Sequence, residues 1–224
     1  PFYLFWSNPQ LLLLIQTFVV GAGSFFVYAI AKYIIKNKNI ALIFAFVYLL
    51  NPAVERANLY DFHAVTLSTT FLLGTSYFYL KKNYKFFIVF ALLSALCKEQ
   101  IWVIIALFGI LLFVQQKKRL LGTIIFLVSI GIFYLLIWHI IPLVRGSPHF
   151  ALAYYSDFGD SPTTIILTAL LSPPKIISII FQPDRIGYLI QLFSPYGFLS
   201  LLSPVFLLLA IPDLLINLLN NNQL

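Results

Sequence analysis

The sequence predicts an all-α protein, a polytopic transmembrane helix bundle. Hydrophobic residues make up 61% of the 224-residue chain and charged residues only 9%, whereas a soluble domain carries about 25% charged residues. The apolar residues also gather in long runs separated by short polar connections. Aromatic residues reach 17%, as expected where rings anchor helices at the headgroup level. We therefore expect an integral membrane protein whose main partner is the lipid bilayer.

The positive charge of the chain is concentrated in three short turns. The formal net charge is +7, and nine of the 14 Lys and Arg residues lie in or beside these turns between apolar runs. Such clusters are typical of the cytoplasmic loops of membrane proteins, so we expect no nucleic-acid partner. None of the seven acidic residues lies in the three turns. This separation suggests that any chemistry takes place on the opposite, outer face.

Residues 1–224 are expected to form a single transmembrane domain that is a fragment of a longer protein. The chain has no methionine and begins Pro-Phe-Tyr. Its start lacks the basic residues of a cleavable signal peptide. The single cysteine, Cys97, excludes a disulfide within the chain.

The first spans are expected at residues Leu11–Ile35 and Ile40–Val54. The first has about 25 residues, enough to cross a hydrocarbon core roughly 30 Å thick. Its Gly21-Ala22-Gly23-Ser24 stretch predicts close helix packing. The second is short, and Asn51-Pro52 loosens its end. Between it and the next apolar run lies a polar stretch, Glu55–His63, here called the first tip.

The next three apolar runs are Ala64–Leu80, Phe86–Cys97 and Ile101–Val114. Lys98-Glu99-Gln100, the second tip, separates the last two, which form either one long span or a hairpin of two short helices. Basic clusters flank this pair, at residues 81–85 on one side and 117–119 on the other. Both clusters favour the cytoplasm, which requires an even number of crossings and favours the hairpin.

The C-terminal part begins with a full-length span, Leu120–Leu143, followed by an outer loop over residues 145–163. Residues 165–180 are broken by Ser172-Pro173-Pro174-Lys175, and we expect them to lie partly in the membrane interface. The remaining apolar runs are Ile186–Phe193 and Phe198–Leu219. The side of the membrane on which everything after residue 180 lies is left open.

The two tips are expected to meet in a water-accessible pocket. Helices of twelve to fifteen residues reach only about 18–22 Å, less than the roughly 30 Å of the core. A charge at that depth costs on the order of 3 kcal/mol unless it is paired or hydrated. Adjacent Lys98 and Glu99 point about 100° apart on a helix. We therefore expect Asp61 to pair with Lys98, and Arg56 or His63 to pair with Glu99.

Three stretches carry a resemblance to a known family. They are Asn58-Leu59-Tyr60-Asp61-Phe62-His63, Ala95-Leu96-Cys97-Lys98-Glu99 and Pro212-Asp213-Leu214-Leu215-Ile216-Asn217-Leu218-Leu219. The chain resembles the prokaryotic membrane family catalogued as domain of unknown function two thousand and seventy-nine. Gln100 departs from the acidic residue of the family pattern, which weakens a metal role at the second tip.

That family is grouped with the GT-C superfamily of polyprenyl-phosphate-sugar glycosyltransferases. The resemblance implies a GT-C-like helix bundle in a prokaryotic plasma membrane, with short hairpins whose polar tips face the outer side. It implies a catalytic pocket there and a polyprenyl-phosphate-linked sugar as donor. It also implies a central acidic residue in a first outer loop, which would precede Pro1.

The tips contain the residue types that such a transfer needs. A carboxylate can take the proton of the acceptor, and cations can stabilise a phosphate leaving group. Asp61 and Glu99 are the candidate bases, and Arg56, His63 and Lys98 are the candidate phosphate ligands. The alternative is a structural ion-pair network that closes the outer ends of the helices. Asp-x-His supplies only two metal ligands, so no metal site is assigned, and the cofactor is left open.

Other candidates are weaker, and two other functions compete. We expect Asp157 and Asp160 to lie in an exposed loop, Tyr154 and Tyr155 to stack on a sugar or lie at the interface, and His139 to bond within the bundle.

A transporter is the second hypothesis, because charges within a membrane often mark substrate paths. It would show inverted repeats, and the sequence has none. A non-catalytic membrane scaffold is the third.

Overall fold

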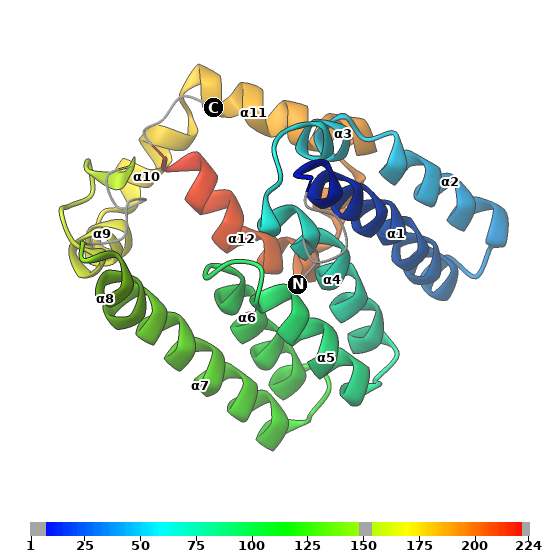
Figure 1. The fold of residues 1–224 in the computed structure, drawn as a ribbon, viewed down its shortest axis with the longest axis horizontal. Helices are drawn as coiled ribbons and strands as arrows, with labels where there is room; N and C mark the ends of the chain where they lie inside the picture. The colour runs from blue at the N-terminus through cyan, green and yellow to red at the C-terminus, as the bar shows by residue number, and fades with distance from the viewer. Residues whose placement is uncertain (1–7, 148–153, 221–224) are drawn as a thin grey trace. The chain divides into compact units, whose positions relative to one another are not determined.

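The computed structural model describes residues 8–147 and 154–220, and within them the regular elements are all helices. The chain divides into two compact units, Pro1–Ile101 and Trp102–Leu224. The helices of unit 1 are α1 (Gln10–Ile35), α2 (Lys38–Leu49), α3 (Pro52–Leu59), α4 (Ala64–Leu80) and α5 (Tyr84–Ala95) (Figure 1). Both tips belong to this unit, so its internal packing decides where they lie.

Close packing around Gly23 joins α1 to α2 and α4. A Cβ at Gly23 would collide with the Tyr48 hydroxyl and would lie 2.9 Å from Thr70 Oγ1. Those hydroxyls donate hydrogen bonds to the α1 backbone, Tyr48 to Val20 O at 2.9 Å and Thr70 to Val19 O at 2.7 Å. A Cβ at Gly21 would meet nothing within 4 Å. The predicted close packing is therefore confirmed at Gly23 and not at Gly21.

The expected span Ile40–Val54 is two helices, because α2 and α3 meet at a 43° bend. Pro52, the first residue of α3, has no N–H with which to continue α2. The Asn51 side chain starts the new helix by accepting a hydrogen bond from the Ala53 N–H at 2.8 Å. The first tip is thus partly helical: residues 55–59 form the end of α3, and only residues 60–63 are irregular.

Helices α4 and α5 form an antiparallel hairpin lined with aromatic rings. The Phe78 and Phe86 rings are stacked with centroids 5.1 Å apart, and Gly74 leaves room for the Phe90 ring. Helix α4 runs parallel to α1, since Thr70 bonds to Val19 and the Tyr77 ring lies against the Phe26 ring about two turns further along both helices. The turns after α1 and α4 therefore lie at one end of unit 1, and the two tips lie at the other.

The second tip is a real break in the chain. Helix α5 ends at Ala95, and α6 (Ile101–Val114) begins five residues later. A single uninterrupted helix over residues 86–114 is therefore excluded. The observed boundaries agree with the two short runs that the sequence predicts.

Unit 2 continues with α7 (Arg119–Leu135), a π-helical turn (Leu136–Ile140) and α8 (Ile141–Arg145), which together form one apolar span, Arg119–Arg145. Helices α9 (Pro162–Leu171) and α10 (Pro173–Ile180) follow at a bend of 85°, as the prolines predict. The last two helices are α11 (Pro183–Phe193) and α12 (Pro204–Leu218).

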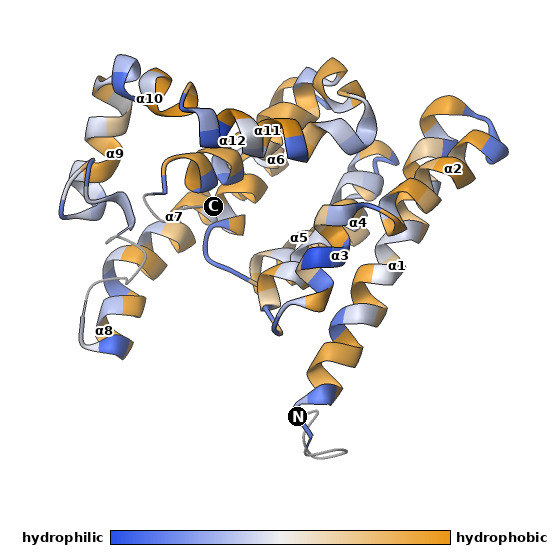
Figure 2. Cartoon of the chain, turned by 90° about the horizontal axis from the view of Figure 1, so that it is seen from above, coloured by the Kyte–Doolittle hydropathy of each residue, from blue (hydrophilic) through white to orange (hydrophobic). Residues whose placement is uncertain are grey.

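Two helices in the described part of the chain are long and apolar enough to cross a membrane, Gln10–Ile35 and Arg119–Arg145, or up to four spans if each bent pair counts as one. Figure 2 shows the same pattern, with hydrophobic helices and hydrophilic residues concentrated in the connections. The all-α membrane fold class is confirmed, with fewer full-length spans than apolar runs.

Candidate functional site

The first tip is tied to α1 by one buried amide. Gln16 is 0% exposed. Its Oε1 accepts a hydrogen bond from the backbone N–H of His63 at 3.0 Å, and its Nε2 lies 3.3 Å from the backbone oxygen of Ala57 and 3.4 Å from that of Asn58. The amide thus contacts the end of α3 and the start of α4 together, which fixes the connection between them.

The predicted site residues of the first tip lie on the protein surface. Asp61 and His63 are exposed, as is Arg56 on α3. His63 Nδ1 lies 2.9 Å from the backbone oxygen of Asp61. A carbonyl oxygen only accepts, so Nδ1 must carry the proton, and Nε2 of the neutral ring is left as an acceptor. The Tyr60 ring lies 5.7 Å from the imidazole, centroid to centroid.

The second tip lies at the same end of the α4–α5 hairpin as the first. Phe78 pairs with Phe86, and Gly74 with Phe90. If this residue pairing is extended past the end of α5, Lys98 lies opposite the first turn of α4, which directly follows His63. Lys98 is exposed, whereas Glu99 and Gln100 are half-buried. Both tips therefore sit at one end of unit 1.

The expected pairing of Asp61 with Lys98 is not found. Within residues 8–147 and 154–220, neither side chain takes part in an ion pair, and the same holds for Arg56 and His63. All four side chains are exposed on the protein surface. Four of the five predicted site residues are consequently not held in a charge network among the described residues.

A comparison with protein families assigns the chain. The family model described as Predicted membrane protein (DUF2079) matches residues 1–224. The chain belongs to this family. No curated protein and no solved structure matches it. DUF2079 membership agrees with the resemblance seen at the tips, and it establishes a membrane protein.

Gln16 contacts the first tip although the charged residues of the sequence do not predict it. It was visible as an amide inside the otherwise apolar span Leu11–Ile35, and a buried polar side chain in a membrane helix requires a partner. Asn58 shows the opposite case, because its buried Oδ1 has no hydrogen-bond partner among residues 8–147 and 154–220. An acceptor left unpaired within the first tip is an exception to the usual rule for buried polar atoms.

The described residues contain no group of three or more His, Cys, Asp and Glu side chains arranged to hold a metal ion. Cys97, beside the second tip, bonds to the backbone oxygen of Leu93 at 3.3 Å. Burial raises the pKa of this thiol, which disfavours the reactive thiolate.

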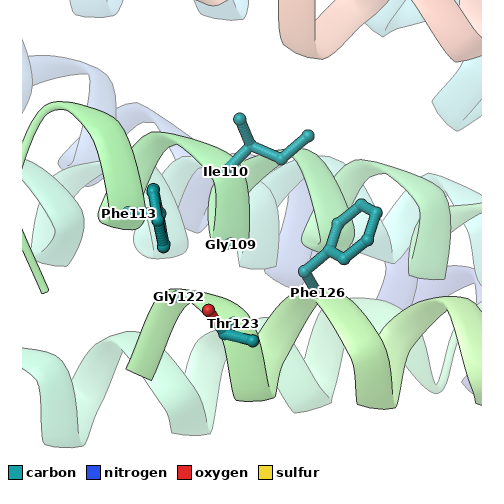
Figure 3. Close-up of a pocket in the computed structure, with 6 residues that line it drawn as sticks. All are labelled: Gly109, Ile110, Phe113, Gly122, Thr123 and Phe126. Carbon is teal, nitrogen blue, oxygen red and sulfur yellow. The ribbon is translucent and has the colours of Figure 1, made fainter. Parts of the chain in front are cut away.

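Unit 2 has a small apolar hollow. The hollow, of about 150 Å³, lies between α6 and α7 and is lined by Gly109, Ile110, Phe113, Gly122, Thr123 and Phe126 (Figure 3). It has no charged side chain and does not fit a phosphate.

Tyr155 lies in the segment before α9. The hydroxyl of Tyr155 donates to the backbone oxygen of Ile216 at 2.8 Å. Burial and the Asp213 carboxylate raise the pKa of Tyr155 to about 12. The expectation that Tyr155 stacks on a sugar or anchors at the interface stays a prediction, while the exposure predicted for Asp157 and Asp160 is confirmed.

Proposed function

We propose that the chain is the core of a GT-C-like membrane glycosyltransferase that uses a polyprenyl-phosphate-linked sugar at the outer membrane face. The observation that carries the proposal is the charge separation in unit 1. Its three acidic residues, Glu55, Asp61 and Glu99, belong to the two tips. Its lysine-rich turns lie at the other end of the parallel α1 and α4.

The tips supply a base and cations on one surface. Asp61 is exposed and outside any ion pair among the described residues, so its carboxylate is available to take the proton of an acceptor hydroxyl. Glu99, half-buried, is the second candidate base. Arg56 and Lys98 carry permanent charge that can neutralise the phosphate released with the lipid carrier. His63 can add a third cation when Nε2 is protonated.

The test is sugar transfer by the full-length protein. Asp61→Asn and Glu99→Gln remove the proposed bases while keeping their size, and loss of general base catalysis lowers turnover by about 100-fold or more. Glu55→Gln is the matched control, because Glu55 is an exposed acid of the same tip to which no role is assigned. Unchanged transfer from a polyprenyl-phosphate donor in both test variants would remove these acids from the mechanism.

A transporter is the second candidate, favoured by the broken helices. The bends of 43° and 85° resemble the interrupted helices that line transport paths. A transporter would move a substrate into proteoliposomes without forming a glycosidic product. Uptake that depends on Asp61, in the absence of transfer, would therefore favour this candidate over the enzyme.

A further inference from the structure

The end of unit 1 opposite the tips is a concentrated cationic surface, here called the lysine end. Its six lysines are all exposed. They are Lys32, Lys36, Lys38, Lys81, Lys82 and Lys85. No acidic residue occurs in residues 17–54 or 64–97, which form the helices around this end. The surface therefore has a single sign of charge with no internal counter-ion.

Two of these lysines occupy backbone positions that normally require glycine. Lys36 follows α1 with φ 60°, and Lys82 follows α4 with φ 57°. After α4, the Lys82 N–H bonds to Tyr79 O at 3.1 Å and the Asn83 N–H to Phe78 O at 3.0 Å, which is the Schellman pattern with Lys82 at the left-handed position. After α1, the Lys36 N–H bonds to Lys32 O at 3.0 Å, the simpler left-handed cap.

A side chain in the left-handed region destabilises the backbone, and glycine avoids this strain. The sequence nevertheless places a lysine at both positions. Both side chains are exposed and neither has an interaction within the described residues, so the charge is the property of lysine that can offset the strain. The negative end of a helix dipole attracts cations, and so does an anionic surface outside the protein.

Tyrosine rings place this end at the level of lipid headgroups. The Lys81 ammonium lies 4.4 Å from the centroid of the Tyr33 ring on α1 and 6.0 Å from that of the Tyr77 ring on α4. Lys32 lies 5.5 Å from the Tyr28 ring. Tyrosines collect where a helix leaves the hydrocarbon core and meets the headgroups. The lysines beside them are then at the depth of lipid phosphates.

We propose that the lysine end is a docking surface for the headgroups of anionic phospholipids in the leaflet that it faces. Lys36 and Lys82 present their charges from the left-handed turns, and the Lys81 ammonium lies near the Tyr33 and Tyr77 rings. The surface has cations for lipid phosphates and aromatic rings at the glycerol level. This inference is independent of the chemistry at the tips.

The experiment compares two double variants of the full chain in detergent micelles. Lys36→Gly with Lys82→Gly removes two charges and relieves the left-handed strain, whereas Lys36→Arg with Lys82→Arg keeps both charges. Phosphatidylglycerol and phosphatidylcholine are titrated, and bound lipid is counted by native mass spectrometry. Thermal melting without added lipid is measured in parallel, and glycerol phosphate serves as a headgroup without acyl chains.

The proposal expects the native protein to prefer phosphatidylglycerol. It also expects the glycine variant to lose about fivefold in affinity for each lysine removed, without melting at a lower temperature, while the arginine variant retains its affinity. An unchanged affinity of the glycine variant overturns the proposal. The proposal is also overturned if the glycine variant fails to fold or melts at a lower temperature in lipid-free detergent. Either result would mean that the two lysine charges stabilise the helix ends. Equal competition by glycerol phosphate overturns the assignment to a lipid.

Discussion

The buried Gln16 side chain on α1 accepts a hydrogen bond from the His63 backbone N–H, 47 residues away in sequence, at 3.0 Å. The same amide reaches the backbone of α3 through its Nε2. Because Gln16 is an amide, it can accept on one side and donate on the other. One side chain thereby holds both ends of the segment that carries Asp61.

Replacing Gln16 with leucine should loosen the first tip. Gln16→Leu leaves the His63 N–H and two carbonyl oxygens without their partner, and each unsatisfied buried group costs about 1–3 kcal/mol. Hydrogen exchange at the His63 amide should accelerate. Thr17→Val is the adjacent control, since the Thr17 hydroxyl bonds only to Leu13 O within α1. Equal exchange in the Gln16 variant and the native protein would mean that the amide does not hold the tip.

The packing of α1 against α2 and α4 should tolerate no side chain at Gly23. Gly23→Ala drives a methyl group into the Tyr48 and Thr70 hydroxyls, and overpacking of this kind costs about 1–3 kcal/mol. We expect a lower denaturation midpoint in detergent. Gly21→Ala on the same helix meets nothing within 4 Å and should leave the midpoint unchanged or raise it. A reversed order of the two variants would refute this packing.

Unit 2 offers a second glycine contact that can be tested in the same way. A Cβ at Gly122 would lie 2.5 Å from Gly109 O and 2.7 Å from Phe113 N, which are backbone atoms that cannot turn aside. Gly122→Ala should therefore separate α6 from α7 and destabilise the protein by about 1–3 kcal/mol. Gly131→Ala, also on α7 but with nothing within 4 Å, is the control. Two variants of equal stability would contradict the close approach.

Stability should fall in the alkaline range because of Tyr155. Burial, with the Asp213 carboxylate, raises its pKa from 10.0 to about 12. Between these values the unfolded chain loses the phenolic proton while the folded protein keeps it, so the stabilisation present below pH 10 declines as the pH rises toward 12. Tyr155→Phe should flatten this part of the profile of melting temperature against pH. A profile identical to that of the native protein would exclude Tyr155 as its source.

Local sequence patterns predict most of the helices from α1 to α6. The runs Ala64–Leu80 and Ile101–Val114 coincide with α4 and α6, because basic turns or polar tips bound them and no proline interrupts them. The sequence Asn51-Pro52 predicts only part of the bend between α2 and α3. The proline marks the end of one helix, but the capping bond from Asn51 that starts α3 depends on the observed backbone.

The candidate site is less predictable, since its geometry depends on contacts that are distant in sequence. The charged residues of the tips are conspicuous in an apolar chain, whereas the bonds of Gln16 span 41 to 47 residues. The pairing of Asp61 with Lys98 is expected from the cost of a charge below the headgroups, which pairing or hydration can offset. Both side chains are exposed, and ion pairs between exposed side chains contribute little stability.

The sidedness of unit 1 is the most direct test of the account. Cys97 is first replaced by serine, and single cysteines are then introduced by Tyr60→Cys, at the first tip, and Asn83→Cys, at the lysine end; both native residues are exposed. A thiol reagent that cannot cross membranes is added to intact cells and to inverted vesicles. We predict that the position 60 thiol is labelled in intact cells and the position 83 thiol only in inverted vesicles. Labelling of both thiols from the same side would contradict the proposed separation of the tips from the lysine end.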